Sequence, residues 1–408
     1  MSKKPLVILG ASALVVLLVG GLIYFLAPRL GDLSTFSASP QGSSRLPADT
    51  VQAKVIQIIE EGEITLGDNN PQTYQILLVQ LLDGQYAGRQ VIIDYGQRQI
   101  RPEGLRLQPD ERILVTVGKQ PDGQITAYFT DYVRTNSLLW LVAAFVILTI
   151  LISGWKGVRS LIGLVLSFVV IIAYIIPQIL QGEDPVRVSI IGAFFLLGTT
   201  LYLVYGWTLK THAAALGMLI ALLITGLLSG IFVNLTRLTG YSDENAMFLV
   251  QMAETQINLR GLVLAGMLIG ALGVLDDLVA TQSSAVFELR AADPELNIHD
   301  LYSTAMRIGS DHVAATVNTL FMAYAGAALP MLLLFSLSGQ RYGYLINLEF
   351  VTEEIVRTLV GSLGLIMAVP ITTLLASLIA LYNQRLGGLR RYLGPDNSGT
   401  SGHSHTHA

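Results

Sequence analysis

The stretch from Leu259 to Ser284 reads LRGLVLAGMLIGALGVLDDLVATQSS, and it decides the fold class. A helix needs about 20 apolar residues to cross the roughly 30 Å hydrocarbon core of a membrane, and this stretch supplies them. The whole chain has the same character, because 52% of its 408 residues are hydrophobic and 13% are charged, against about a quarter charged in soluble domains. The sequence therefore predicts an integral membrane protein that is mainly α-helical.

Apolar runs of similar length recur along the chain, which predicts about eight transmembrane helices. They are Pro5–Leu26, Leu138–Ser153, Val158–Ile176, Val186–Tyr205, Ala213–Leu235, Leu259–Ala280, Val313–Phe335 and Ile355–Leu381. The first, within residues 1–30, is interpreted as a retained signal-anchor helix, with a cleaved signal peptide as the alternative. The other seven form a transmembrane domain over residues 136–385, which a disordered cytoplasmic tail follows over residues 386–408. Lys and Arg residues on the predicted inner loops place both termini in the cytoplasm.

Residues 31–135, between the first two spans, are polar and form the predicted soluble domain, outside the cytoplasm. Five β-type runs separated by turn signals predict a small β-barrel of the OB type. The runs are Val51–Ile59, Thr73–Leu82, Gln90–Tyr95, Arg112–Val117 and Gln124–Phe129. They contain no row of aromatic residues and no cluster of carboxylates that would indicate a ligand. We therefore expect a structural or docking role, with a protein as the partner of this domain.

Ionisable side chains within spans are costly in lipid, so each is a functional candidate. The sixth span ends with Asp276 and Asp277. Gly266, Gly270 and Gly273 precede Asp277 at steps of four, three and four, which places these residues on one helical face. Because small residues allow close helix contact, this face is predicted to pack inside the bundle and to carry Asp277 with it. Asp276 lies about 100° around the helix and is the weaker candidate.

The seventh span begins with a second candidate pair, Asp311 and His312. The sixth and seventh spans run in opposite directions, so this pair and Asp277 are expected at a similar depth near the cytoplasmic leaflet, where they could meet. The alternative is that the carboxylates lie at the membrane surface and are solvated by the cytoplasm. Between the two spans, Asn297–Ile308 has apolar residues at helical spacing and is predicted to be an amphipathic helix at the interface.

Two motifs and the order of the elements carry a family resemblance. The motifs are GVLDDLV at Gly273–Val279 and DHVAATVNTLFMAYAGAALP at Asp311–Pro330, and the order is one span, an outer domain and seven more spans. In these features the sequence resembles the YibE/F family of bacterial multipass membrane proteins. The resemblance implies a bacterial inner-membrane location and brings no particular chemistry. A more distant resemblance, to the membrane domains of SecF-type and other RND proteins, implies proton coupling, although Asp311 and His312 stand where SecF proteins carry an arginine.

These observations predict an ion-coupled transporter or an export-associated membrane machine. In it Asp277 binds or relays a proton or cation, and Asp311 and His312 tune or share that charge. The alternative is a non-catalytic membrane scaffold or assembly factor whose outer domain binds a partner. An intramembrane aspartyl protease would also need two carboxylates, but its Gly-x-Gly-Asp pattern is absent, so no enzymatic activity is predicted.

Charge and composition exclude several other classes. The formal net charge is −4 and no basic stripe appears, so nucleic acid is not an expected partner. The chain contains no cysteine, which excludes disulfides and thiolate metal sites, and no cofactor is predicted. In the tail, His403, His405 and His407 alternate as in weak metal sites, but a disordered polar tail is the favoured interpretation.

Overall fold

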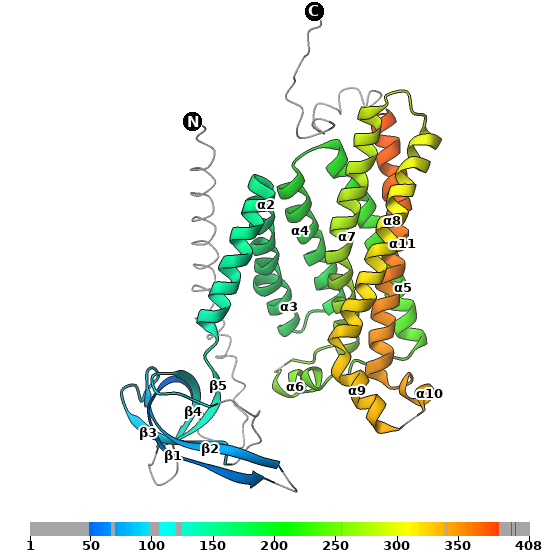
Figure 1. The fold of residues 1–408 in the computed structure, drawn as a ribbon. Coiled ribbons are helices and arrows are strands. Elements are labelled where there is room, and N and C mark those ends of the chain that lie inside the picture. Colours follow the sequence, from blue (N-terminus) through cyan, green and yellow to red (C-terminus); the bar gives the residue numbers. More distant parts are fainter. Residues whose placement is uncertain are drawn as a thin grey trace, which may run out of the picture. The chain divides into compact units, whose positions relative to one another are not determined.

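The computed structural model describes residues 49–66, 70–97, 106–119, 125–253, 255–339, 341–382, 393 and 396 (Figure 1). The chain divides into two compact units, one of residues 39–148 and one that includes residues 149–408. The predicted signal anchor and the tail histidines lie outside the described residues, so both stay predictions.

The first unit contains a five-stranded antiparallel sheet. Its strands are β1 (Asp49–Leu66), β2 (Asn70–Leu81), β3 (Gln90–Tyr95), β4 (Arg112–Lys119) and β5 (Ile125–Tyr132). The strand order is β3-β2-β1-β4-β5, and β3 also lies against β5, so the sheet curls into a nearly closed barrel. All five predicted strands are present. The main difference is in β1, which continues from Ile59 to Leu66 because this polar segment pairs with the first half of β2.

Aromatic side chains fill the barrel where β3 and β5 meet. Tyr95 in β3 is 2% exposed, and its ring packs edge-on against Phe129 in β5, with 4.8 Å between the ring centroids. Phe129 in turn packs against Tyr132 at 5.3 Å, and the hydroxyl groups of Tyr95 and Tyr132 are in contact. Since no strand pairing joins β3 to β5, these rings hold the barrel shut.

Replacing Tyr95 by alanine is expected to destabilise the barrel by about 3–5 kcal/mol, the usual cost of deleting a buried aromatic ring. Tyr95→Phe keeps the ring and loses one hydroxyl contact, so it should cost only about 1 kcal/mol. The measurement is urea unfolding of the full chain in detergent, followed by proteolysis within the barrel. Tyr128→Ala is the matched control, since Tyr128 lies on β5 with 49% of its surface exposed. Equal shifts for Tyr95→Ala and Tyr128→Ala would contradict the sealing role.

Helices make up the rest of the described chain (Figure 1). They are α2 (Thr135–Val170), the π-helical turn η2 (Ile171–Ile175), α3 (Ile176–Leu180), α4 (Pro185–Tyr205), α5 (Leu209–Leu235), α6 (Glu244–Met252), α7 (Leu259–Ala292), α8 (Ile298–Ala327), α9 (Leu329–Ser338), α10 (Tyr342–Leu345) and α11 (Glu349–Tyr382). By length and composition, five helical segments of the described chain could cross a membrane, or six if the bent pair α8 and α9 is one span. The chain is thus a mainly helical, multipass membrane protein.

The predicted count of eight spans differs from this number for two reasons. The first predicted span lies outside the described residues, and the next two fall within one continuous segment, Thr135–Leu180. A straight helix of 46 residues would be about 69 Å long, more than twice the membrane core. Gly154, with φ 56° and ψ −133°, interrupts this segment between the two predicted spans. The number of crossings within residues 135–180 therefore stays a prediction.

The structure corrects the prediction of a separate amphipathic helix at Asn297–Ile308. Asn297 caps the start of α8, and residues 298–308 form its first turns. The helix continues without interruption to Ala327, because the connecting residues Gly309–His312 include no proline to end it. The break comes later, where α8 and α9 meet at 61°. Pro330 lies in the first turn of α9, and its missing N–H group and its ring exclude it from the interior of a straight helix.

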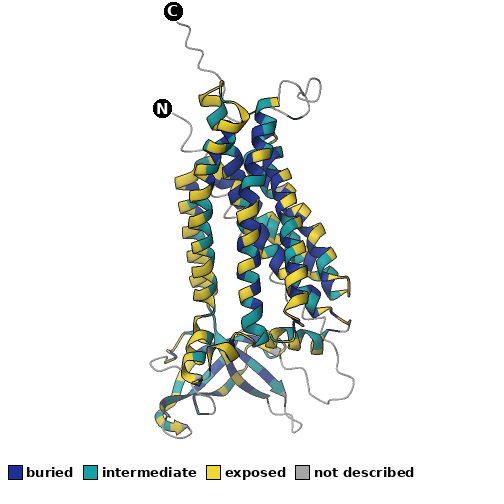
Figure 2. Ribbon diagram, turned by 90° about the vertical axis from the view of Figure 1, so that its right-hand side faces the viewer, coloured by how far each residue is buried: buried dark blue, intermediate teal, exposed yellow. Residues whose placement is uncertain are grey.

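The core of the helical unit is built on close contact between α5 and α11, where small residues recur in steps of four. Gly217 in α5 faces Thr372 in α11, and Thr225 in α5 faces Gly364 in α11. Between these pairs, Ala221 and Ala368 are both fully buried in one apolar cluster. Figure 2 shows buried residues along the inner faces of the bundle helices. Small residues at such contacts let helix backbones approach closely, which is a main source of packing energy in lipid.

Candidate functional site

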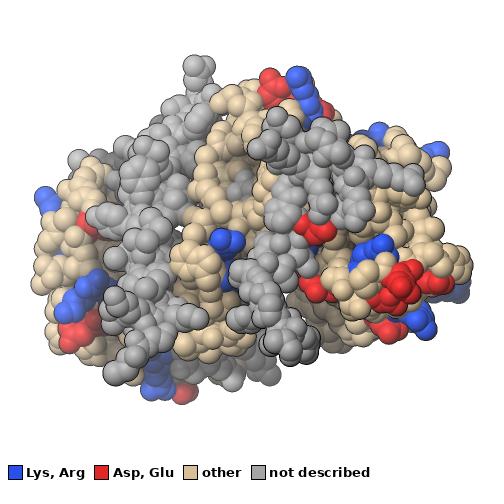
Figure 3. Space-filling model, turned by 90° about the horizontal axis from the view of Figure 1, so that it is seen from above, with Lys and Arg blue, Asp and Glu red and all other residues tan. Residues whose placement is uncertain are grey.

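Asp276 and Asp277 lie within α7 rather than at its end. The span was predicted to end at Ala280, but the helix continues to Ala292. At 1.5 Å per residue, about 20 Å of helix separates Asp277 from Arg290, which lies near the α7–α8 connection. Figure 3 shows acidic and basic side chains together at this end of the bundle. The two carboxylates are therefore set back from the charged end, and their own surroundings decide what they can do.

Asp276 points toward α4 and is half-buried. Its Oδ1 atom is shielded from solvent and has no hydrogen-bond partner among the described residues. The hydroxyl group of Thr200 in α4 is a hydrogen-bonding neighbour of its side chain, and Tyr205 is close enough to interact electrostatically with both carboxylates. Leu275 on the same helix is 1% exposed, so the setting is largely apolar.

The Thr200 hydroxyl group can serve either protonation state of Asp276. Thr200 Oγ1 donates to the carbonyl oxygen of Leu196 at 2.9 Å. A hydroxyl group has one proton to donate and two lone pairs to accept with, so in this orientation Thr200 can only accept a bond from Asp276. A protonated Asp276 carboxyl group can donate that bond. An ionised carboxylate would need the hydroxyl group to rotate and donate instead, which requires the movement of a single hydrogen.

The face that carries Gly266, Gly270, Gly273 and Asp277 is exposed on the described chain, contrary to the predicted packing inside the bundle. A Cβ atom at Gly266 or Gly273 would meet no heavy atom of the described residues within 4 Å, and at Gly270 it would meet the Tyr324 hydroxyl group at 3.8 Å. No helix of the described chain therefore packs closely against these glycines, although such packing had been predicted. The opposite face of α7 is buried because its large apolar residues fill the bundle core: Leu268, Leu272, Leu275, Leu278 and Val279.

His312 lies beside α7, about one turn beyond Asp277. Its Nδ1 atom is 3.5 Å from Thr281 Oγ1, and the Thr281 hydroxyl group donates to the backbone carbonyl of Asp277 at 2.8 Å. Asp311 is exposed, and its side chain forms no hydrogen bond or ion pair with any residue that the structure describes. No group of three or more His, Asp or Glu side chains in the described chain could hold a metal ion. The two helices thus approach each other through His312 and Thr281, and no pairing of Asp277 with Asp311 is seen.

Gln282 was not singled out by the sequence, yet it joins three helices near these candidates. The side chain is 2% exposed. Its Nε2 atom donates to the carbonyl oxygen of Ala305 in α8 at 3.0 Å and to Thr373 Oγ1 in α11 at 2.7 Å. The only signal in the sequence was an uncharged polar residue within a long helical run, which is common on exposed faces as well. Gln282 fixes α7, α8 and α11 relative to one another next to the candidate residues.

A polar cavity of about 650 Å³ lies at the opposite end of the bundle. It is bounded by the start of α6, the junction of α8 with α9, and the first turns of α11. Arg357 in α11 forms ion pairs with Glu353 at 2.5 Å and Glu354 at 2.6 Å, and Ser242 donates to Glu353 at 3.3 Å. Spacings of three and four are typical of solvated helix surfaces, so the sequence alone did not indicate a cavity here.

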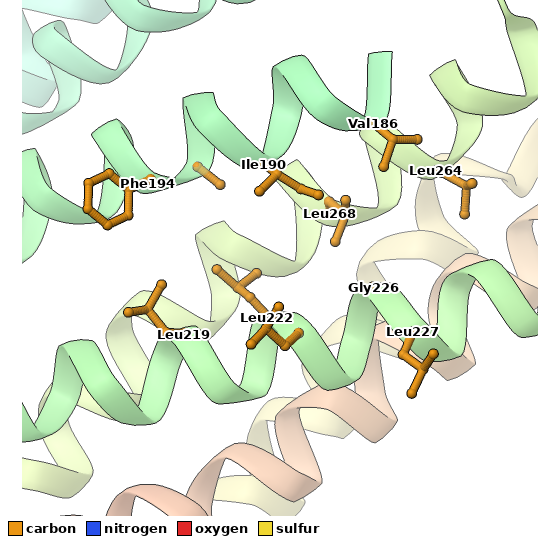
Figure 4. Close-up of a pocket in the computed structure, with 11 residues that line it drawn as sticks. Val186, Ile190, Phe194, Leu219, Leu222, Gly226, Leu227, Leu264 and Leu268 are labelled. Carbon is orange, nitrogen blue, oxygen red and sulfur yellow. The ribbon is translucent and has the colours of Figure 1, made fainter. Parts of the chain in front are cut away.

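A second cavity, of about 370 Å³, lies between α4, α5 and α7. Figure 4 shows its apolar lining, with Ile190 and Phe194 from α4 facing Leu219 and Leu222 from α5, and Leu268 from α7 behind them. All the lining residues are apolar, so this cavity offers no group for acid–base or ion chemistry. The candidate site is therefore the region of Asp276, Asp277 and His312, together with the polar cavity.

Comparison with known proteins gives one match. The family model of the YibE/F-like proteins matches residues 141–381, which is more than half of the chain and includes every candidate residue. No curated protein and no solved structure shows a significant match.

Proposed function

We propose, from the premise that this chain belongs to the YibE/F-like family, that it is an ion-coupled membrane transporter or an export-associated membrane machine. In this proposal Asp276 binds and releases a proton or a cation, and Asp277 and His312 lie nearby without carrying the ion themselves. The observation that carries the proposal is the half-buried Asp276 carboxyl group, whose Oδ1 atom is shielded from solvent within an apolar bundle. Ionisable groups at such positions are rare and usually serve a function.

The surroundings of Asp276 suit a group that changes its charge. Burial of a carboxylate without a compensating partner is costly, so binding a proton or a cation relieves that cost. The Thr200 hydroxyl group can accept from the protonated acid while it donates to Leu196, or it can turn and donate to the ionised form. Both the protonated and the ionised Asp276 side chain thus have a hydrogen-bond partner.

The proposal also assigns a location and an orientation. The chain would lie in a bacterial inner membrane with both termini in the cytoplasm, so the α7–α8 connection would face the cytoplasm. Basic residues near this side of the bundle agree with that orientation, among them Lys156, Arg159, Lys210, Arg290 and Arg307. The proposed activity needs no catalytic residue and no cofactor.

Charge displacement in reconstituted proteoliposomes tests this function. The wild-type chain is adsorbed on a solid-supported membrane and exposed to jumps of proton, sodium and divalent-cation concentration. A transient current for one of these ions is the expected result. A folded protein that stays silent under every jump would count against ion coupling.

The second candidate function is a membrane scaffold or assembly factor that binds a protein through its barrel. One observation favours it: apolar residues lie exposed on the outer face of the sheet. Ile92 in β3 is 62% exposed and pairs with Leu78 in β2, which in turn pairs with Gln57 next to the 38% exposed Ile56 in β1. Exposed apolar residues on neighbouring strands of a soluble domain are typical of an interaction surface. Silence in the electrical measurement would favour this candidate.

A further inference from the structure

Two cavities adjoin each other at Arg357 and Tyr324. The larger, which we call the acidic vestibule, is the cavity of about 650 Å³ between α6, the α8–α9 junction and α11. The smaller, of about 10 Å³, lies between α7, α8 and α11 and has Gly270 and Gly361 in its wall. Arg357 and Tyr324 line both cavities, so these two side chains form the partition between them.

The vestibule carries an excess of negative charge. Asp243, Glu244, Glu353 and Glu354 line it, and among the described residues around it Arg357 is the one basic residue. A cavity lined by one sign of charge concentrates ions of the opposite sign. Glu353 and Glu354 are the two carboxylates that hold the Arg357 guanidinium group. A cation that enters the vestibule therefore competes with Arg357 for its two partners.

Two of the helices that line the small cavity, α7 and α8, also carry the candidate residues Asp277 and His312. Val274 in α7 lines it, and Asp277 follows on the same face of that helix about 4.5 Å further along. Leu320 in α8 also lines it, and His312 lies eight residues earlier on that helix, about 12 Å away along the axis. His312 and Thr281 form a polar contact between the two helices on the side of the α7–α8 connection.

We propose that Arg357 is a plug, displaced by small inorganic cations, between the acidic vestibule and the small cavity that α7, α8 and α11 line. The inference rests on the proposed ion-coupled function and names its substrate class, a small cation with the proton included. Arg357 acts by position: while Glu353 and Glu354 hold it, it closes the partition with Tyr324. When a cation neutralises these carboxylates, the guanidinium group is released and the small cavity opens to the vestibule.

The chain contains no cysteine, so single-cysteine variants can be made in the natural background. Ala327→Cys places a thiol in the vestibule, and Gly361→Cys places one in the small cavity, where a Cβ atom meets no described atom within 4 Å. Leu359→Cys is the control, because Leu359 is 46% exposed on the same helix and lines neither cavity. Each variant, in lipid nanodiscs, is treated with a charged thiol reagent that cannot enter lipid.

We expect Ala327→Cys to react and Gly361→Cys to react at least about tenfold more slowly, which corresponds to about 1.4 kcal/mol of closure. When Arg357→Ala is added to each variant, the reaction rate of Gly361→Cys should rise toward that of Ala327→Cys. Leu359→Cys should stay unreactive. With Arg357 intact, sodium, calcium or acid should raise the Gly361→Cys rate relative to Ala327→Cys, whereas N-methyl-D-glucamine at equal ionic strength should not.

Equal rates for Gly361→Cys and Ala327→Cys with Arg357 intact would overturn the plug. If neither Arg357→Ala nor any cation changes the Gly361→Cys rate, the small cavity does not open to the vestibule and the proposal is wrong. If Arg357→Ala opens the cavity and no cation does, displacement by cations is wrong. If Arg357→Ala also exposes Leu359→Cys, that variant is misfolded and the cation series in the native background decides. The thiol reaction measures accessibility and does not require transport. A failure of the plug can therefore be distinguished from a failure of ion coupling, which the electrical measurement tests.

Discussion

Replacing Gly364 by alanine is expected to destabilise the helical bundle by about 1–3 kcal/mol, the usual cost of forcing an extra atom into a packed interior. The added Cβ atom would overlap with Thr225 Oγ1 and lie 3.2 Å from Thr225 Cβ. The Thr225 hydroxyl group cannot turn away freely, because it donates to the carbonyl oxygen of Ala221 at 2.8 Å. The helices α5 and α11 would have to separate along the contact on which the core is built. Thermal unfolding in detergent and the yield of monodisperse protein measure the effect.

Gly361→Ala is the matched control for this prediction. Gly361 lies one turn earlier on the same helix, so the change in helix propensity is the same, but its Cβ atom would meet nothing within 4 Å among the described residues. Alanine favours a helix over glycine by about 1 kcal/mol, and Gly361→Ala should therefore be neutral or stabilising. If the two variants behaved alike, the α5–α11 contact would not be as close as the structure shows.

The contact also predicts which second substitution can restore stability. Thr225→Ala removes the hydroxyl oxygen that the new methyl group at residue 364 would overlap, so the double variant should regain most of the loss. Gly217→Ala should resist the equivalent repair by Thr372→Ala, because its Cβ atom would also lie 3.0 Å from Thr372 Cβ and 3.1 Å from Thr372 Cα, which remain. Rescue of both pairs, or of neither, would contradict this geometry.

The barrel could be predicted from the sequence because its signal is local. Alternation of apolar and polar residues and the turn residues between them depend on near neighbours, and all five strands appear where that pattern placed them. The second half of β1 could not be predicted, since Glu60, Glu61 and Glu63 do not favour a strand by themselves. They lie in one because they pair with β2, for example Glu60 with Ile76.

The helices could be predicted in position but not in their contacts. Spacing shows that Gly266, Gly270, Gly273 and Asp277 share a face of α7, and it does not show whether that face is buried. The glycines that do pack closely, Gly217 and Gly364, lie far apart in the sequence, and each faces a threonine of the other helix. That match exists only once α5 and α11 are paired.

The same limit applies to the burial of the two carboxylates. The sequence ranks Asp277 above Asp276 because Asp277 follows the glycine stripe. The structure turns the leucine face of α7 inward instead, which exposes Asp277 and brings Asp276 against α4. Thr200 and Tyr205 could not be assigned to the site beforehand, because nothing local links them to residues more than one helix away.

Asp276→Asn is therefore expected to abolish the ion-dependent transient current that the proposed function predicts. Asparagine has the shape of aspartate and keeps a carbonyl oxygen and an amide group for Thr200, so the contact with α4 can persist. It cannot bind or release a proton, and it carries no charge to hold a cation. Charge displacement on solid-supported membranes, with wild type and variant reconstituted at equal density, measures the loss.

Asp277→Asn is the matched control for this prediction, because it makes the same chemical change at the neighbouring residue. Asp277 is exposed, its side chain forms no hydrogen bond or ion pair with the described residues, and its removal should leave most of the current. If Asp277→Asn abolishes the current and Asp276→Asn does not, the exposed carboxylate is the carrier and burial is a poor guide to function in this bundle. If both variants abolish it, the two carboxylates act as one unit, as neighbouring groups that titrate together do.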